Sequence, residues 1–380
     1  MRLLRFPTKP GEQYRLEQVP ASTKIPYIAI SHVWMDPGTS YEHEILFHEF
    51  NDPGVWKTKP DGAAKIKGAC DTARSWSARR KGFDSNAPEV KHIWLDTCCV
   101  DQKNSVELTT AINSMYRWYQ NATTCFVYLS DIEKLPGQDL DLSKCRWWTR
   151  GWTLQELVAS SVTEFFDRNW TRIGDKKTLQ SSLTAITKIG APYLADSKMV
   201  SRASVAHRMS WAAGRQTRQE EDMAYSLMGI FGVQMPTLYG EGRVSAFRRL
   251  QEEIVKYSND HSIFAWNDEE GTAGETGLLA PSANCFKKSG AYVHTPTPQV
   301  NEPFSLTNKG LSIVLPLQKH QMQYIASIDC PVDAGFIGVY LEFDQVTGVY
   351  RRVRPGELCK VLKGGRGQPQ RLYVRHRFDM

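Results

Sequence analysis

The residue types best suited to chemistry gather in three short segments of the chain. The first, Ser31-His-Val-Trp34, follows an apolar run that is typical of a buried strand. In parallel α/β sheets, ligands bind outside the carboxyl ends of the strands. Ser31, His32 and Trp34 are therefore candidates for the lip of a pocket. The alternative is a turn with a packed tryptophan, since a lone histidine is more often a structural hydrogen-bonding residue.

The second segment is Trp94-Leu-Asp-Thr-Cys-Cys-Val-Asp-Gln102. Asp96 is expected at the end of a strand, where an acidic side chain can orient a sugar hydroxyl. Alternatively, Asp96 and Thr97 satisfy backbone donors at the turn that follows the strand. Cys98 is a poor candidate nucleophile, because no base lies near it in the sequence.

The third segment, Arg146-Trp-Trp-Thr-Arg-Gly-Trp-Thr-Leu-Gln-Glu-Leu157, is rich in tryptophan and arginine. One interpretation makes Glu156 a catalytic carboxylate at the start of a helix, with Arg150 near a phosphate. The other interpretation is a capping box, since Thr153 precedes Glu156 by three residues. The two side chains would then only hydrogen-bond to backbone N–H groups at the start of the helix.

Several common catalytic signatures are absent from the sequence. It has no P-loop, no Gly-x-Gly-x-x-Gly after a strand, no Gly-x-Ser-x-Gly and no His-Glu-x-x-His. This disfavours P-loop hydrolysis, hydride transfer on a Rossmann site, serine hydrolase chemistry and zinc proteolysis. No Cys-x-x-Cys pair occurs either, so we expect no metal site.

The elements that position these residues alternate along the first part of the chain. Continuous apolar runs predict strands covered on both faces at 26–31, 92–96, 124–129 and 162–166. Apolar residues at helical spacing predict helices over 61–80 and 105–120. Strands alternating with helices indicate an α/β fold with a mostly parallel sheet.

Beyond residue 178 the pattern changes twice. Helical spacing dominates first, and an acidic, glycine-rich stretch at 267–277 then predicts a linker. Short β-type runs follow, at 311–317, 323–328, 337–343 and 350–353. We therefore expect an α/β part at 1–178, a helical part at 179–268 and a small β-rich domain at 269–380. The tail after Lys363 is expected to be loosely held.

Composition limits the class of protein further. The 380 residues are 41% hydrophobic and 23% charged, which excludes disorder, collagen and coiled coil for the chain as a whole. The net charge of +6 is not concentrated in any block, so no nucleic-acid partner is expected. We also expect no membrane span and no signal peptide, and we expect the eight cysteines to be free thiols in the cytoplasm.

Taken together, the motifs resemble those of the fungal heterokaryon-incompatibility (HET) domain proteins. The resemblance covers about residues 25–266 and is carried by segments in a characteristic order. These are Tyr27-Ile-Ala-Ile-Ser-His-Val-Trp34, Trp94-Leu-Asp-Thr-Cys-Cys-Val-Asp101, Ala111-Ile-Asn-Ser-Met-Tyr-Arg-Trp-Tyr119, Arg150-Gly-Trp-Thr-Leu-Gln-Glu-Leu157, Arg208-Met-Ser-Trp-Ala-Ala213, Glu221-Asp-Met-Ala-Tyr-Ser-Leu-Met-Gly-Ile230 and Leu238-Tyr-Gly-Glu-Gly242.

HET domains in turn look like distant relatives of Toll/interleukin-1 receptor (TIR) domains, which have a flavodoxin-like α/β fold. Trp152-Thr-Leu-Gln-Glu-Leu157 is similar to the stretch that carries the catalytic glutamate of NAD-cleaving TIR enzymes. The resemblance implies that Glu156 stabilises an oxocarbenium-like centre while the nicotinamide–ribose bond of NAD breaks. It also implies supporting roles for neighbouring side chains: ribose or phosphate contacts for Ser31 and Asp96, stacking for Trp34 or Trp152, pyrophosphate binding for Arg150, and the pocket lip for His32.

This interpretation requires no cofactor and no metal, with NAD as a substrate, and links the protein to incompatibility and cell death. It predicts Glu156 within about 10–12 Å of both Ser31 and Asp96. One alternative is a biosynthetic enzyme of secondary metabolism, in which His32, Asp96 and Glu156 do acid–base chemistry on a small metabolite. Another is a non-catalytic module that forms homo-oligomers, with Glu156 only capping its helix.

Overall fold

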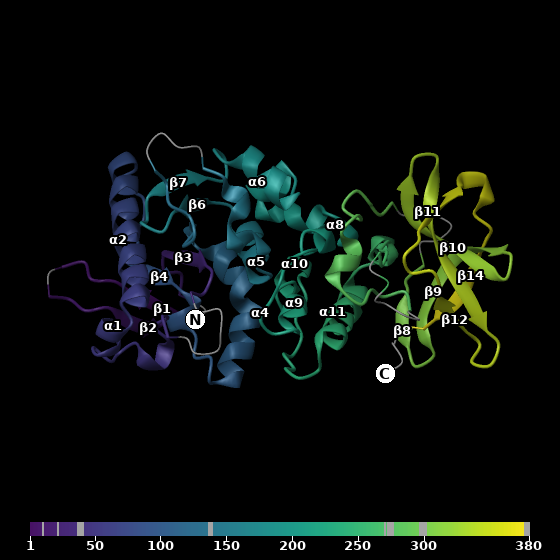
Figure 1. Ribbon diagram of the computed structural model, residues 1–380, viewed down its shortest axis with the longest axis horizontal. Coiled ribbons are helices and arrows are strands. Elements are labelled where there is room, and N and C mark those ends of the chain that lie inside the picture. The colour runs from purple at the N-terminus through teal and green to yellow at the C-terminus, as the bar shows by residue number, and fades with distance from the viewer. Residues whose placement is uncertain are drawn as a thin grey trace. The chain divides into compact units, whose positions relative to one another are not determined.

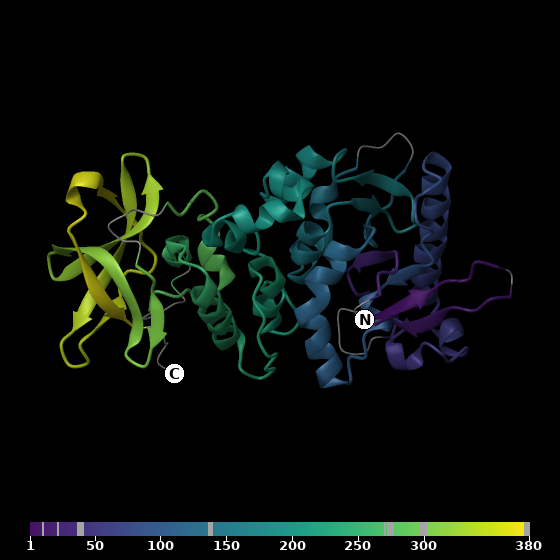
Figure 2. The same ribbon diagram turned by 180° about the vertical axis from the view of Figure 1, so that it is seen from behind.

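The protein is described by a computed structural model (Figures 1 and 2) that covers residues 1–9, 11–20, 23–35, 42–135, 140–269, 271, 277–295 and 302–375. The chain forms two compact units, Met1–Ser197 and Lys198–Met380. The domain boundaries expected after residues 178 and 268 remain a prediction. Among the described residues, no helix has both the length and the hydropathy that crossing a membrane requires.

The first unit is built on a seven-stranded sheet with the strand order β2-β1-β4-β3-β5-β6-β7. The strands are β1 (Arg2–Arg5), β2 (Arg15–Gln18), β3 (Tyr27–His32), β4 (His92–Trp94), β5 (Thr124–Tyr128), β6 (Thr163–Phe166) and β7 (Arg172–Asp175). The four expected strands are therefore present, and the structure adds three more at the two edges.

The centre of this sheet is parallel and its edges are antiparallel. β3 pairs in parallel with β4 and β5, and β5 pairs in parallel with β6. β1, β2 and β7 are antiparallel to their neighbours, so the sheet as a whole is mixed rather than mostly parallel. The edge strands were not predicted because β2 and β7 lack a continuous apolar run and the run within β1 has only two residues, Leu3 and Leu4.

Helices cover both faces of the sheet. They are α1 (Val55–Thr58), α2 (Pro60–Phe83), α3 (Asp96–Cys99), α4 (Ser105–Asn121), α5 (Trp152–Ala159), α6 (Gln180–Thr187) and α7 (Ala191–Ala195). Figure 1 shows α2 on one side of the sheet and α4 with α5 on the other. The chain leaves β3 towards β4 and later returns across β3 to β5, so the direction of winding reverses at β3. Ligands of open α/β sheets bind at the carboxyl ends of the strands where this reversal occurs.

The second unit combines short helices with a small barrel, seen in green to yellow in Figure 2. Its helices are α8 (Val205–Ser210), α9 (Asp222–Tyr225), α10 (Met228–Phe231) and α11 (Arg243–Tyr257). Its strands are β8 (Ser305–Thr307), β9 (Gly310–His320), β10 (Gln323–Val332), β11 (Gly335–Asp344), β12 (Val349–Arg352), β13 (Cys359–Leu362) and β14 (Gln368–Val374). Because β9 pairs with both β10 and β14, the path β9-β10-β11-β12-β14 closes on itself. The expected β-rich C-terminal part is confirmed; of the expected linker, residues 270 and 272–276 lie outside the described residues.

The described part of the C-terminal tail is ordered, and the prediction for it was wrong. Instead of being loosely held, Gln368–Val374 forms β14 and pairs with β9 along its whole length. Leu372 and Val374 are buried in the barrel. A strand whose first four residues are exposed has too few apolar positions to be recognised without its partner. Residues 376–380 lie outside the described part of the chain.

Candidate functional site

Two polar clusters lie at the carboxyl end of β3, one on each face of the sheet. Successive side chains of a strand point to opposite faces, so Ser31 faces α5 and His32 faces α2. The Ser31 cluster comprises Ser31, Tyr119, Trp147 and Glu156. The His32 cluster comprises His32, Trp34, Glu44, Lys65 and Asp96. The residues expected to form one site are thus divided between two faces of the same edge.

The Ser31 cluster is centred on a hydrogen bond between strand and helix. Ser31 Oγ donates to Glu156 Oε2 and accepts from Trp147 Nε1 at 2.8 Å. The Tyr119 hydroxyl donates to the Ile30 carbonyl at 3.1 Å and also hydrogen-bonds Glu156. Ser31 is fully buried and Glu156 is 6% exposed. The predicted proximity of Glu156 to Ser31 is therefore confirmed.

The environment of Glu156 favours its protonated form. Burial is the main reason that its pKa rises to about 8, and the negative charge of Asp96 adds to the increase. The hydrogen bonds that Glu156 makes with Ser31 and Tyr119 and the positive charge of Arg150 oppose the increase without cancelling it. Glu156 is therefore mostly neutral at pH 7.

The capping-box interpretation of Glu156 is wrong. The residue that precedes the first turn of α5 is Gly151, so Thr153 already lies inside the helix. Its hydroxyl donates to the carbonyls of Trp147 at 2.6 Å and Arg150 at 2.9 Å. Glu156 lies beyond the first turn and its carboxyl group faces Ser31.

On the other face, Asp96 makes hydrogen bonds with two of the predicted site residues, His32 and Trp34. It accepts from Trp34 Nε1 at 2.8 Å, and its Oδ1 lies 2.9 Å from His32 Nε2. Asp96 is not at the end of a strand, because β4 stops at Trp94 and Asp96 begins the short helix α3. Burial alone would raise the pKa of Asp96, but the charge and hydrogen bond of His32, with help from Trp34 and Lys65, lower it.

Next to His32 lies a buried ion pair, Lys65–Glu44, that was not predicted from the sequence. Lys65 Nζ is 2.5 Å from both carboxylate oxygens of Glu44, and both side chains are 1% exposed. Lys65 Nζ is also 3.1 Å from His32 Nδ1, and Glu44 accepts from the Met35 amide at 2.9 Å. A signal was present in the sequence, because Lys65 occupies the same helical face as the buried residues Ala69 and Ala73.

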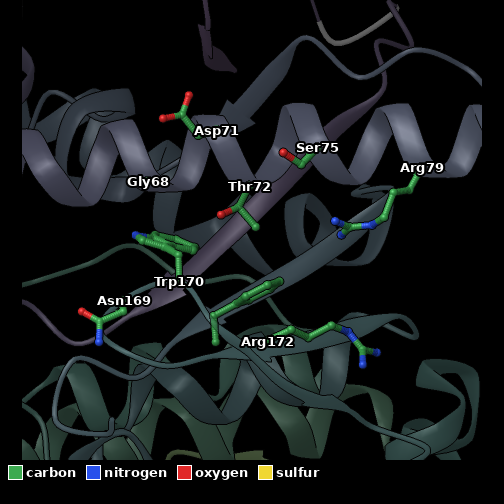
Figure 3. Close-up of a pocket in the computed structure, with 9 residues that line it drawn as sticks. Gly68, Asp71, Thr72, Ser75, Arg79, Asn169, Trp170 and Arg172 are labelled. Atoms are coloured by element: carbon green, nitrogen blue, oxygen red, sulfur yellow. The ribbon is translucent and has the colours of Figure 1, made fainter. Parts of the chain in front are cut away.

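The remaining predicted residues surround these clusters. Arg150 and Trp152 lie at the start of α5, and both are partly exposed. Cys98 is buried in α3, and burial raises the pKa of its thiol well above the usual range, so it is not an activated nucleophile. Within the described ranges, no group of three or more His, Cys, Asp or Glu residues is arranged to hold a metal ion. A surface cavity lies elsewhere in this unit, between α2 and the β6–β7 hairpin (Figure 3).

Comparison with known proteins agrees with the motifs at this edge of the sheet. Residues 27–139, which include β3, β4, β5 and the helices between them, match the family described as "Heterokaryon incompatibility protein (HET)". The predicted resemblance to HET-domain proteins is confirmed over residues 27–139, which match the HET family. Residues 245–280 match a second family, described as a domain of unknown function (DUF8212).

Among curated proteins, the chain is similar to the vegetative incompatibility protein HET-E-1 of Podospora anserina. The two are 40% identical over 253 residues, which is 65% of this chain. The chain spans only 17% of that relative's length. No solved structure matches the chain significantly.

Proposed function

We propose that the first unit is a TIR-like enzyme that cleaves the nicotinamide–ribose bond of NAD with Glu156 as its catalytic carboxylate. The observation that carries the proposal is the hydrogen bond between Ser31 and Glu156 at the carboxyl edge of β3. The sheet changes its direction of winding at this strand, which is the usual position of a ligand crevice. The central order β4-β3-β5-β6 also suits the flavodoxin-like arrangement of TIR domains.

The pKa of Glu156 is compatible with this chemistry. Loss of nicotinamide leaves positive charge on the ribose, which an ionised carboxylate stabilises. Glu156 is mostly protonated without substrate, since its pKa is about 8. The nicotinamide ring of NAD is cationic, and a nearby cation favours the ionised carboxylate. Substrate binding thus promotes the active form of Glu156 and releases a proton.

The other predicted residues have supporting roles in this proposal. Asp96, whose pKa is lowered by His32, stays ionised and accepts hydrogen bonds from ribose hydroxyls. Arg150 binds the pyrophosphate, and Trp34 or Trp152 stacks on a ring of the substrate. Loss of NAD would connect the reaction with vegetative incompatibility, after which the Podospora relative is named.

The test is nicotinamide release by the purified full chain supplied with NAD. We expect Glu156→Gln to lower the rate by roughly 10²–10⁴-fold. In wild type, kcat/KM should increase with pH up to about 8, the pKa of Glu156 in the free enzyme. Glu133→Gln, which removes a half-exposed carboxylate of the same unit, is the matched control and should keep full activity. Equal release by wild type and Glu156→Gln, or none by wild type, would contradict the proposal.

A biosynthetic acid–base enzyme is a second candidate. It is favoured by two pKa values that are shifted in opposite directions. The pKa of Glu156 is raised and the pKa of Asp96 is lowered. Such a pair provides a general acid and a general base at the same pH. The test compares wild type and Glu156→Gln in a metabolite extract by mass spectrometry. Consumption of a metabolite other than NAD by wild type alone would favour this candidate.

The non-catalytic, oligomerising module also has an observation in its favour. The hydroxyl of Ser31 is partnered both as donor and as acceptor, and Glu156 is almost fully buried. In this case the Ser31 cluster only stabilises the sheet edge. Wild type and Glu156→Gln would then form the same oligomers, measured by light scattering, and neither would turn over NAD or a metabolite.

A further inference from the structure

The surface cavity in Figure 3 has features of a second binding site. Its volume is about 450 Å³, within the usual range for small-molecule pockets. One wall is the solvent side of α2, including Thr72, Ser75 and Arg79, and the other contains Phe166 and Trp170. It shares no residue with the Ser31 cluster or the His32 cluster.

The aromatic wall is held rigidly by the turn that follows β6. The buried Asp167 carboxylate accepts from three backbone amides, those of Lys134 at 2.9 Å, Asn169 at 2.9 Å and Thr171 at 2.8 Å. This turn places Trp170 in the left-handed region, with φ of +59°, which a bulky residue rarely adopts. Such backbone strain concentrates at ligand sites.

The Trp170 ring is also fixed from two sides. It stacks on Tyr128, with ring centroids 4.6 Å apart and an interplanar angle of 23°. Its edge lies against Gly68 of α2 so closely that a Cβ atom at Gly68 would be 2.2 Å from Cδ1 and Nε1 of the indole. Only glycine at position 68 allows this approach. The aromatic wall therefore exists before any ligand binds.

The helical wall presents donors that have no protein acceptor. Thr72, Ser75 and Arg79 share one face of α2 and line the cavity. Within the described part of the chain, neither hydroxyl makes a hydrogen bond and no carboxylate pairs with Arg79. The other charged groups of the cavity are paired: Asp71 binds Arg74 at 2.6 Å, and Arg172 binds Glu164 at 2.6 Å and Asp175 at 2.5 Å. One cation and two hydroxyls thus remain for a ligand.

We infer that this cavity binds a small molecule in which a planar aromatic ring is joined, directly or through a short linker, to one phosphate or carboxylate group. The ring packs against Phe166 and Trp170, and the anionic group binds the Arg79 guanidinium with the Ser75 hydroxyl beside it. An arginine binds either oxyanion through paired N–H groups. The pocket therefore selects the combination of ring and anion rather than either part alone.

Isothermal titration calorimetry on the full chain tests this inference with two anionic probes, AMP and indole-3-acetate. Adenosine and inorganic phosphate each supply half of the required chemistry and serve as reference ligands. We expect at least one anionic probe to bind saturably, at least tenfold more tightly than either reference. Comparing the affinities of AMP and indole-3-acetate shows whether the site prefers a phosphate or a carboxylate. If neither anionic probe binds, the inference is overturned.

Variants locate the binding. Arg79→Ala should weaken it by roughly tenfold to a hundredfold, the usual effect of losing a charge-assisted hydrogen bond. Lys81→Ala removes an exposed cation of the same helix outside the cavity and should have no effect. Both side chains are exposed, so neither change threatens the fold. Unchanged affinity in Arg79→Ala, or equal losses in both variants, would overturn the assignment.

AMP also resembles half of NAD, so the experiment must distinguish binding at the cavity from binding at the Ser31 cluster. Binding at the cavity should persist in Glu156→Gln, and nicotinamide release from NAD should persist in Arg79→Ala. Loss of AMP binding in Glu156→Gln would assign the probe to the Ser31 cluster and overturn the second site. The second site does not depend on NAD cleavage, because a protein without turnover can still bind AMP through Arg79.

Discussion

Two carboxyl groups at one edge of the sheet have pKa values that their surroundings shift in opposite directions. Glu156 lies among Tyr119, Trp147 and Ser31, where burial outweighs the hydrogen bonds and raises its pKa to about 8. Asp96 faces His32 and the Trp34 indole, and these lower its pKa although burial opposes them. The difference comes from the partners, because both residues are held close to the carboxyl end of β3.

The raised pKa of Glu156 predicts a pH-dependent stability. The folded state holds a proton up to about pH 8, whereas the unfolded state releases it near 4.5. The stability contributed by this proton is complete below about pH 4.5 and is lost as pH rises through 8. Glu156→Gln, which carries no charge, should become more stable relative to wild type over this range, by roughly 2–4 kcal/mol. Urea denaturation at pH 5, 7 and 9 measures the difference.

An exposed carboxylate supplies the control for this experiment. Glu220 is exposed in the second unit, so Glu220→Gln should show the same pH dependence as wild type. A difference between Glu156→Gln and wild type that stays constant from pH 5 to 9 would show that the Glu156 carboxyl ionises normally in the folded protein.

Ser31 should affect both stability and activity. In Ser31→Ala the buried Trp147 indole N–H loses its acceptor, which costs about 1–3 kcal/mol. The Ser31 hydrogen bond also lowers the pKa of Glu156, so its loss should raise that pKa further. Under the proposed function, the pH profile of nicotinamide release then shifts to higher pH. Trp147→Phe removes the indole N–H that donates to Ser31 but keeps the hydrogen bond between Ser31 and Glu156. It should therefore leave the pH profile of nicotinamide release unchanged.

At the scale of the elements, the strands and long helices were predictable because their signals are local. The apolar runs of β3 and β5 and the helical spacing of α4 each lie within one short stretch of sequence. The Asn104 side chain caps α4 by accepting hydrogen bonds from the amides of Val106 and Glu107. The capping box at Thr153 failed because α5 already begins at Trp152.

The paired side chains were much less predictable. The Lys65–Glu44 pair joins residues 21 apart, and the Ser31–Glu156 bond joins residues 125 apart. Neither has a local sequence pattern. Glu156 was still placed near Ser31, because the carboxyl ends of parallel strands meet at one edge and its motif resembles that of TIR enzymes. The position of His32 and Asp96 on the opposite face was not foreseen, since alternation along β3 separates side chains that are adjacent in sequence.

The Lys65–Glu44 pair should attach α2 to the segment after β3. Lys65→Met leaves a buried, uncompensated carboxylate and should destabilise the protein by about 3–5 kcal/mol. The double variant Lys65→Met/Glu44→Leu removes both charges and should be more stable than Lys65→Met alone. A double-mutant cycle by urea denaturation measures the coupling. Additive losses would show that the two side chains do not interact in the folded state.

At the scale of the whole molecule, the second unit is tied together by a buried arginine. Arg352 of β12 donates to the carbonyls of Phe264 at 3.1 Å and Trp266 at 2.5 Å, and its guanidinium lies 3.7 Å from the centre of the Trp266 ring. Burial lowers the pKa of Arg352 to about 9, so it remains charged at pH 7. These contacts join the barrel to the segment after α11 within the compact unit Lys198–Met380.

The two units should respond to acid in opposite ways. His261, buried in the second unit, has a pKa lowered to about 4, mainly by burial, although the charges of Asp329 and Asp260 oppose the shift. An unfolded chain binds this proton near pH 6.5, so the stability that His261 contributes is complete above 6.5 and is lost as pH falls through 4. The loss amounts to roughly 3 kcal/mol. Over the same range the Glu156 proton favours the folded first unit.

Acidification from pH 7 to pH 5 should therefore lower the stability of the second unit relative to that of the first. Thermal unfolding of the full chain, combined with limited proteolysis and mass spectrometry, identifies the unit that opens. Between pH 7 and pH 5 we expect cleavage within 198–380 to move to lower temperature and cleavage within 1–197 to move little or to higher temperature. His261→Phe keeps an aromatic ring beside Phe264 and Phe304 but cannot titrate, so its second unit should lose less stability on acidification, whatever its stability at pH 7. The same acid sensitivity in wild type and His261→Phe would exclude His261 as its cause.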